Sequence, residues 1–364
     1  MIQYQIRYAD TYGATICFIP DFQQCEYAVR ADGKIGGMQI VLPKYYKSIV
    51  NPNMVDYRLS VYRSVNGAPF SIDGSTEFLA RKWETDDNSI TVFADSLQSL
   101  LQRRIIAYPA NVLTYSKFSD FAGNICKRIM RTNFGADILV SRDGDEINAD
   151  ISTLLTINAD TNDGTAIQIS CSRRNVADAI ESICNASYEN GTWIAGLITS
   201  DGNQWRFDTY ANYYGVYRPE VLFSPDIGNV QNVKISFDLT EQKTFIIAGG
   251  QGQEAARIIT SAYSSSGIAA SFLNRNEYFY QNTQVNDINY LQALASQELR
   301  SLRGQQTFEC ELVQTPSSIR GLHYNLGDVL QVQFDSQRYI MRLDQVQVSI
   351  GQSGVNEKAV LNTP

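Results

Sequence analysis

The sequence of 364 residues contains one histidine, His323, and only three tryptophans. A Ser- or Cys-based catalytic triad would have to use this histidine, and the residues around it form no nucleophile-elbow pattern. A zinc site is excluded as well, because one histidine and dispersed cysteines cannot supply a Cys/His ligand set. We therefore expect His323 to lie in a loop without a catalytic role.

Targeting and membrane signals are also lacking. Residues 1–7 alternate polar and apolar side chains, without the basic and apolar parts of a secretory signal. No run approaches the ~18–20 apolar residues that span a bilayer. The cysteines show no C-x-x-C pair, so we expect folding in a reducing cytoplasm, no membrane insertion and reduced, mostly buried thiols. The six cysteines are Cys17, Cys25, Cys126, Cys171, Cys184 and Cys310.

Positive charge is scarce. The chain has 30 Lys and Arg against 38 Asp and Glu, a net charge of −8. A general nucleic-acid binder needs a basic face to replace the counterions of the phosphates, so this class is disfavoured. The charge agrees with an acidic wall past which nucleic acid slides without adhering. There is no P-loop, no internal repeat and no low-complexity segment.

Aromatic and apolar residues are abundant. The 21 Tyr and 16 Phe suit half-buried pleated sheets, and a hydrophobic content of 44% is that of a globular chain. The length suggests two or three domains. Residues 1–108 are expected to form a first antiparallel barrel or sandwich, because short apolar segments alternate with turn residues. Its strands are expected at 16–19, 26–30, 38–42, 55–65, 78–83 and 90–93.

Helical periodicity begins after this region. A short helix is expected at 96–103, with Asp95 or Ser96 as N-cap. A longer one is expected from Ser116 or Ser119 to about residues 133–135. Its apolar face would hold Phe118, Phe121, Ile125 and Ile129.

A further helix begins at Asn175, and residues 192–198 and 204–210 are predicted to form a hairpin. Residues 109–218 are therefore expected to form an α+β domain. Residues 219–364 are expected to form a second β-barrel region, with a helix at 289–303 that stops at Gly304. The predicted fold class is a β-rich α+β protein. The expected strands of the last region are 308–313, 329–334, 339–350 and 359–361.

One glycine motif resembles the fingerprint of a dinucleotide-binding site. Gly250, Gly252 and Ala255 fit G-x-G-x-x-A after an apolar run. A pyrophosphate site needs a helix directly after the glycines, whereas residues 257–261 are β-branched and predict a strand. The glycines are therefore interpreted as a hairpin turn or bulge.

Two acidic segments are candidate sites. Residues 158–164 resemble the start of a calcium loop, but its sixth and twelfth positions hold Asp163 and Ile169 in place of Gly and Glu. The segment is predicted to be a polar turn. The carboxylates Asp143, Asp145 and Glu146 could serve as a glycosidase pair, and a solvated loop is the preferred interpretation.

The aromatic residues near the end of the middle region admit two interpretations. Tyrosines in an alternating arrangement could stack on sugars, or pack within a sheet. They are Tyr210, Tyr213, Tyr214 and Tyr217. No convincing catalytic constellation emerges, and the sequence predicts no catalytic, cofactor-binding or metal-ligating residues.

Several segments occur in an order and spacing that match one family. They are the N-terminal strand region, 99–106 (SLLQRRII), 221–225 (VLFSP) with 229–230, the turn 249–252 with the strand 257–259, and 324–330 (YNLGDVL). The series resembles the tail-hub proteins (baseplate-hub or tail-tip proteins) of long-tailed bacteriophages, and it covers most of the chain. The resemblance implies two tube-like barrel domains with an intervening domain. Three copies would form a ring whose six barrels mimic one layer of the six-fold tail tube.

The resemblance therefore implies a structural virion protein and not an enzyme. A homotrimer would adapt the six-fold tail tube or distal tail ring to the three-fold tip. Its implied partners are the distal tail or tail-tube protein, the tape-measure protein, a tip fibre or spike protein, and phage DNA passing through the lumen without specific binding. Its place would be the virion tail tip or baseplate, after assembly in the host cytoplasm. The alternatives are a tail-associated cell-wall polysaccharide hydrolase with paired carboxylates and a carbohydrate-binding tail module.

Overall fold

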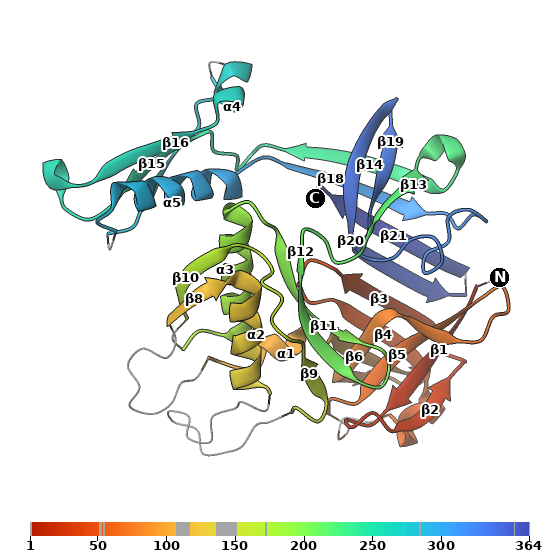
Figure 1. The fold of residues 1–364 in the computed structure, drawn as a ribbon. Coiled ribbons are helices and arrows are strands. Elements are labelled where there is room, and N and C mark those ends of the chain that lie inside the picture. The colour runs from red at the N-terminus through yellow and green to blue at the C-terminus, as the bar shows by residue number, and fades with distance from the viewer. Residues whose placement is uncertain are drawn as a thin grey trace.

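The computed structural model describes residues 2–50, 53, 55–106, 117–135, 151–171, 173–271, 273–283, 285–352 and 354–363. Strands make up 48% and helices 18% of the described residues, which confirms the predicted β-rich α+β class. A 13-stranded sheet dominates the molecule (Figure 1). None of the helices in these ranges is long and apolar enough to cross a membrane.

The N-terminal part of the large sheet confirms the strands expected for residues 1–108. Neighbouring strands pair antiparallel, in the order β3-β4-β7-β6-β5-β1-β2. The turn that follows β5 begins with Asn66 and Gly67, which adopt φ 54° and 81°. The elements are β1 (Ile2–Ala9), β2 (Thr15–Ile19), β3 (Gln24–Arg30), β4 (Gly37–Pro43), the 3-10 helix η1 (Lys44–Ser48), β5 (Arg58–Val65), β6 (Ser71–Thr85) and β7 (Ser89–Ser96).

The C-terminal strands continue the same sheet. β20 pairs antiparallel with β3, so that Val346 lies opposite Val29, and one apolar core extends across both parts. Among the described strands the main pairing path runs from β14 to β2 without closing on itself. The two β regions that were predicted as separate barrels are therefore joined in one large sheet, and no closed barrel is detected in the described part of the chain. The C-terminal elements are β13 (Tyr217–Phe223), η2 (Pro225–Ile227), β14 (Val230–Asp238), β18 (Gln305–Leu312), β19 (Val329–Phe334), β20 (Gln337–Gly351) and β21 (Gly354–Asn362).

The middle region packs two helices against two small sheets around its own core. Helix α3 begins as predicted, because the Asn175 side chain accepts a hydrogen bond from the backbone N–H of Ala177. The predicted hairpin is also present, as β11 paired with β12. The elements are α1 (Ser99–Gln102), β8 (Lys117–Phe121), α2 (Ala122–Asn133), β9 (Leu155–Ile157), β10 (Ala166–Ser170), α3 (Val176–Glu189), β11 (Ile194–Ser200) and β12 (Trp205–Ala211).

Two helix predictions need correction. Helix α1 has Gln98 as its N-cap, because Ser96 is still paired with Phe78 in the large sheet. Ser119 and Phe118 lie in strand β8, opposite Gln168 and Ile169 of β10. Pairing with a strand far along the chain overrides the local helical periodicity there. The alternative start at Ser116 lies outside the described residues.

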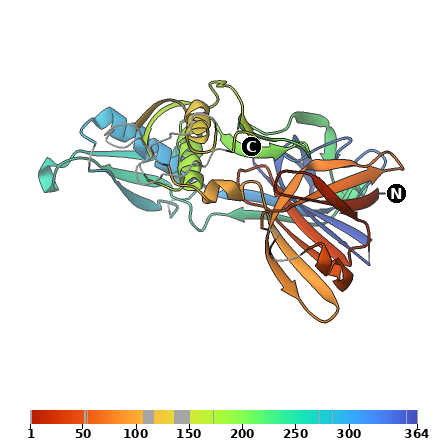
Figure 2. The same cartoon turned by 90° about the horizontal axis from the view of Figure 1, so that it is seen from below.

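A small subdomain, residues 239–304, projects from the body (Figure 1). Figure 2 also places it at the end of the molecule opposite the N-terminus. Helix α5 covers one face of the sheet β16-β15-β17, and Asp287 caps this helix with hydrogen bonds from the N–H groups of Asn289 and Tyr290. The elements are β15 (Phe245–Gly249), η3 (Glu254–Ala256), β16 (Ile259–Tyr263), α4 (Ser265–Ala270), β17 (Glu277–Gln281) and α5 (Ile288–Ser301).

Candidate functional site at the junction of the β regions

Four buried charged side chains meet where the first and last β regions join. Arg63 lies on β5, Asp73 on β6 and Glu357 on β21, while Arg320 lies in the loop between β18 and β19. Each residue is at most 6% exposed. We call these four residues the charged junction. Two cations and two anions balance one another, so the junction carries no net charge.

Arg320 lies at the centre of the charged junction. Its Nη1 and Nη2 donate to the two carboxylate oxygens of Asp73, both at 2.9 Å. Its Nε and Nη2 donate to Glu357 at 3.0 and 3.1 Å. Arg63 completes the group, with Nε 3.5 Å from Asp73 and Nη1 3.8 Å from Glu357. Arginine suits this position because its planar fork binds two carboxylates with fixed geometry.

Neutral side chains donate further hydrogen bonds to carboxylate oxygens that Arg320 also binds. The Tyr27 hydroxyl donates to Asp73 at 2.6 Å, and the Tyr4 hydroxyl donates to Glu357 at 3.0 Å. Burial, and then the charge of Asp73, raise the pKa of Tyr27 well above its usual value. Burial, and then Glu357, raise the pKa of Tyr4. Both tyrosines therefore keep the protons that they donate.

The junction stays charged at neutral pH. Burial raises the pKa of Asp73, but Arg320 and then Arg63 outweigh it and hold that pKa below its usual value. Burial likewise opposes the charged form of Arg320, yet Asp73 and Glu357 raise its pKa. Removing one partner of such a buried pair leaves an uncompensated charge, at a cost of about 3–5 kcal/mol. The junction therefore works as a clamp between two distant parts of the chain.

A second clamp joins the first β region to the hairpin of the middle region. The Arg58 guanidinium lies 3.3 Å from Glu77 and 4.2 Å from the ring centroid of Trp205. The Ser200 hydroxyl donates to Glu77, and its backbone N–H donates to the Ser75 hydroxyl at 2.8 Å. Arg58 and Glu77 are each 1% exposed. The β11–β12 hairpin is therefore anchored through a buried ion pair.

Asp328 provides a third clamp. This residue belongs to the segment 324–330, which carries part of the family resemblance. Its carboxylate accepts from the N–H groups of Val216 at 2.7 Å and Asn325 at 2.9 Å. A Cβ on Gly215 would lie 2.1 Å from the same carboxylate, so the close approach requires glycine. The carboxylate thus fixes the chain entering β13 against the turn before β19.

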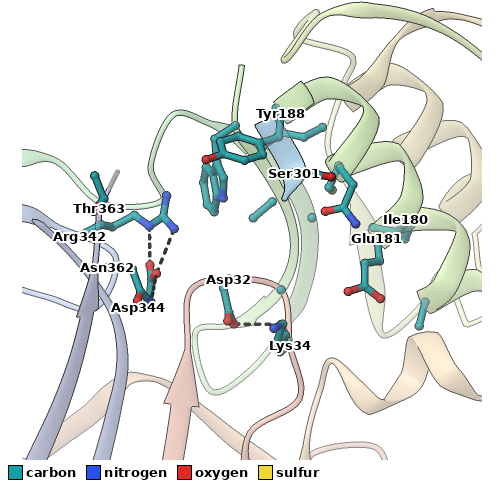
Figure 3. A pocket seen from close by; sticks show the side chains of 18 of the residues that line it. Asp32, Lys34, Ile180, Glu181, Tyr188, Ser301, Arg342, Asp344, Asn362 and Thr363 are labelled. Carbon is teal, nitrogen blue, oxygen red and sulfur yellow. Dashed lines mark hydrogen bonds and ion pairs between the residues drawn. The ribbon is translucent and has the colours of Figure 1, made fainter. Parts of the chain in front are cut away.

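A cleft of about 830 Å³ separates helix α3 from the end of the large sheet (Figure 3). Asp344 lies on one wall, where Nη2 of Arg342 and Nδ2 of Asn362 donate to it at 3.0 and 2.9 Å. Asp32 lies in the β3–β4 turn, 2.6 Å from Arg30. A glycosidase needs carboxyl groups free to act as acid and base. Asp32 and Asp344 are therefore poor candidates for such a pair, although Asp178 and Glu181 also line the cleft.

The glycine motif is a hairpin, as predicted. β15 pairs antiparallel with β16, so that Gly249 lies opposite Ile259. The N–H of Gly250 donates to the carbonyl of Ile258 at 2.8 Å, and Gly252 has φ +103°. The short 3-10 helix η3 follows the glycines in place of the long helix that a pyrophosphate needs.

A lysine ammonium occupies the middle of the polar turn 158–164. Lys127 is fully buried, and its Nζ lies 2.7 Å from Asp208. The same nitrogen donates to the Ala159 carbonyl at 2.9 Å and the Thr161 hydroxyl at 2.7 Å. These are oxygen ligands of the kind that Ca²⁺ takes. The lysine therefore fills the position that a cation would need.

The remaining sequence candidates do not converge on one site. His323 lies in the loop between β18 and β19, as predicted, and its Nδ1 accepts from the N–H of Ile319 at 2.9 Å. The carboxylates of residues 143, 145 and 146 lie outside the described residues. Tyr210 and Tyr214 pack edge to face at 4.8 Å and are half-buried. Tyr213 and Tyr217 are 36% and 45% exposed.

All six cysteines are free thiols, and Cys25, Cys126, Cys171 and Cys310 are buried. Within the described ranges, His, Cys, Asp and Glu side chains form no group of three or more that could hold a metal ion.

Sequence patterns do not single out the charged junction. Arg63 lies within the alternating run 55–65, where a charged residue is read as a solvent-facing position. One of its partners, Glu357, lies 294 positions further along the chain. The sequence signal for the charged junction is a charged residue inside an otherwise apolar strand. That signal is weak until the opposing charge is known.

Comparisons with known proteins support the family predicted from the sequence. The fold resembles a 43 kDa tail protein of prophage MuSo2 from Shewanella oneidensis, with TM-score 0.62, 11% identity, and coverage of 100% of this chain and 98% of the other. It also resembles a tail protein from Neisseria meningitidis, with TM-score 0.61, 10% identity, and coverage of 99% of this chain and 96% of the other. A further similar structure is a prophage tail protein from Listeria monocytogenes, with TM-score 0.53, 10% identity, and coverage of 100% of this chain and 94% of the other. At these identities the likeness shows the fold alone, and none of the curated proteins matches the chain. The model of the Siphovirus ReqiPepy6 Gp37-like protein family matches residues 76–360. The chain belongs to this family of phage tail proteins.

Proposed function

We propose that the protein is a tail hub, a trimeric adaptor between the six-fold tail tube or distal tail ring and the three-fold tail tip. The observation that carries the proposal is the large sheet, which joins the first and last β regions through β3 and β20. The charged junction clamps the same two regions together. Two tube-like barrels per copy, as in the family resemblance, need this kind of rigid link to hold a fixed angle.

Ring closure requires two different surfaces that meet between neighbouring copies. The main path of the large sheet ends at β2 and at β14, and an edge strand presents unpaired backbone groups to a neighbour. Ile16 and Phe18 on β2 are 44% and 45% exposed, and Phe237 on β14 is 62% exposed. These edges support a head-to-tail contact in which β2 of one copy approaches β14 of the next.

The charge supports a channel for DNA. Three copies at −8 each would surround the lumen with acidic protein, and such a wall repels phosphate instead of binding it. The proposed partners follow from this place in the tail. They are the tail-tube or distal tail protein, the tape-measure protein, a tip fibre or spike protein, and DNA in transit. The proposed location is the tail tip or baseplate of the virion.

Light scattering of the purified chain tests the trimer. A chain of 40.8 kDa should give a species at about 120 kDa, the mass of a closed ring of three. Phe18→Lys, which places a charge on the β2 edge, should lower this mass towards that of the monomer. Lys358→Met serves as the control, because Lys358 is exposed but lies on β21 inside the sheet. A wild-type chain that stays monomeric at every concentration would contradict the proposal.

A further inference from the structure

Two cysteines of the middle region meet between helices α2 and α3. Cys126 of α2 is fully buried in the core of this region, whereas Cys184 of α3 packs against the same core and is half-buried. They lie 58 positions apart in the chain, yet their thiols are in hydrogen-bond contact. Contact between two thiols is the first requirement for a disulfide.

The packing of the two helices explains this contact. A Cβ on Gly164 would lie within 3.3 Å of both Cβ of Ala122 and Oγ of Ser187, so the start of α2 lies beside the last turns of α3. One turn further along α2 is Cys126, and one turn back along α3 is Cys184. The helices therefore run antiparallel with small side chains at successive turns. Such side chains let two backbones come close, and a disulfide needs Cα atoms within about 7 Å of each other.

The two thiols differ in their access to reagents. Cys184 lines the cleft of about 830 Å³ beside helix α3 (Figure 3), and a cleft of this volume admits small molecules. Cys126 is 0% exposed. Its hydrogen bond with Cys184, and then burial, raise the pKa of the Cys126 thiol well above its usual value. A reagent in the cleft therefore meets Cys184 first, and Cys126 can react only with the sulfur beside it.

We propose that Cys126 and Cys184 form a redox-controlled disulfide, with Cys184 as the entry thiol and Cys126 as the resolving thiol. The oxidant is a low-molecular-weight disulfide such as oxidised glutathione. The Cys184 thiolate attacks one of its sulfurs, which forms a mixed disulfide and releases one glutathione thiolate. The Cys126 thiolate then attacks the Cys184 sulfur and displaces the second glutathione. The two protein thiol protons pass to the two glutathione thiolates, so one disulfide is reduced for each one formed.

The disulfide joins α2 to α3 covalently. Because it restricts the unfolded chain between the two cysteines, the oxidised protein should have a higher Tm than the reduced one. A reducing cytoplasm keeps such thiols reduced, whereas an extracellular medium favours the disulfide. A virion protein of the kind proposed above passes from the first medium to the second when it leaves the host cell. The bond therefore forms after assembly, while its chemistry does not depend on the hub proposal.

The test treats the native, purified chain with oxidised glutathione and follows its mass, with peptide mapping of the modified cysteines. The wild type should lose two hydrogens, ~2 Da, and the bond should map to Cys126 and Cys184. Cys126→Ser should stop at the mixed disulfide and keep one glutathione on Cys184, because the resolving thiol is missing. Cys184→Ser should form no internal disulfide. Cys17→Ser is the matched control, because Cys17 is also half-buried but lies on β2, and it should form the same bond as the wild type.

The wild type alone can overturn the inference, so the test does not depend on the folding of a variant. Glutathione that stays on Cys184 of the wild type would show that Cys126 cannot resolve the mixed disulfide. A bond that maps to Cys171, the third cysteine of the same core, or no reaction at Cys184 would also overturn it. Dithiothreitol should reverse the expected bond and return the Tm to that of the reduced chain. The mass is read on the chain whether it is monomeric or trimeric, so the result is separate from the light-scattering test of the hub.

Discussion

Arg320 binds Asp73 through both terminal nitrogens of its guanidinium group, although 247 positions separate the two residues in the chain. Each residue is 5% exposed. The pair joins the loop before β19 to strand β6, and so connects the C-terminal part of the large sheet to its N-terminal part. The proposed ring would need its two β regions to move together, and this pair gives them a fixed link.

Replacing the cation should therefore destabilise the whole chain. Arg320→Met keeps most of the side-chain length but leaves Asp73 and Glu357 without their principal partner. We expect the free energy of unfolding to fall by about 3–5 kcal/mol, the usual effect of breaking a buried ion pair from one side. Denaturant unfolding followed by tryptophan fluorescence and circular dichroism measures the change.

The matched control is an exposed ion pair. Lys82 and Glu84 lie 2.6 Å apart with side chains 62% and 56% exposed. Lys82→Met should change the free energy of unfolding by less than about 1 kcal/mol, because water screens such pairs. If Arg320→Met had as small an effect, the charged junction would not be a clamp.

Acid should release the same clamp. Although burial raises the pKa of Asp73, Arg320 and Arg63 hold it below its usual value. A carboxyl group with a depressed folded pKa stabilises the fold above its unfolded pKa, and this contribution is lost as the pH falls through the folded pKa. We expect the unfolding free energy of the wild type to decrease below about pH 4. Asp73→Asn should be less stable at neutral pH, and its deficit should shrink in acid. A constant deficit from neutral pH to acid would contradict this assignment.

Local signals in the sequence predicted the elements that depend on nearby residues. Asn175 starts a helix because its side chain caps the first turn. The glycine motif was predicted as a turn because β-branched residues follow it. In each case the deciding interaction lies within a few positions of the chain.

Interactions between distant segments could not be predicted in the same way. Phe118 fits a helical face, but pairing with Ile169 places it in a strand. The joining of both β regions in one sheet depends on the pairing of Val29 with Val346. The charged junction depends on residues from three parts of the chain. A single sequence contains the charges but not the distances between them.

Because of Lys127, we expect calcium not to bind to or stabilise the middle region. Its ammonium group contacts the Asp208 carboxylate and the Ala159 carbonyl in the turn that resembles a calcium loop. Calcium at millimolar concentration should therefore leave the Tm of the wild type unchanged, since a ligand raises Tm only by binding the folded state. A Tm that rises with calcium but not with magnesium would contradict this expectation.

Removal of the same ammonium should lower stability. Lys127→Met leaves Asp208, whose side chain is 20% exposed, without its cation. The expected loss is about 2–4 kcal/mol, below the value for a fully buried pair because water reaches the carboxylate. Lys234→Met is a suitable control, because Lys234 is 69% exposed and lies 4.0 Å from Glu309. Thermal and denaturant unfolding of the two variants should differ clearly.

Glu77→Gln should loosen the middle region without unfolding the large sheet. Glutamine keeps the volume of the side chain and can still accept from Ser200, but it leaves the buried guanidinium of Arg58 without a counter-charge. The hairpin packs on that guanidinium through Trp205. Amide hydrogen exchange in β11 and β12 should therefore accelerate by about 10- to 100-fold, the loss of one charge-assisted contact in a local opening.

The pattern of exchange decides the interpretation of this variant. Amides of β4 and β7, which pair with each other away from the hairpin, should exchange as in the wild type. Uniform acceleration in all strands would mean that the ion pair stabilises the whole molecule and not the contact with the hairpin. Unchanged exchange in β11 and β12 would mean that the hydrogen bonds between Gln98 and the hairpin are sufficient to hold it. Faster exchange confined to the hairpin is the outcome that a clamp between two rigid regions requires, because only the contact between them has been weakened.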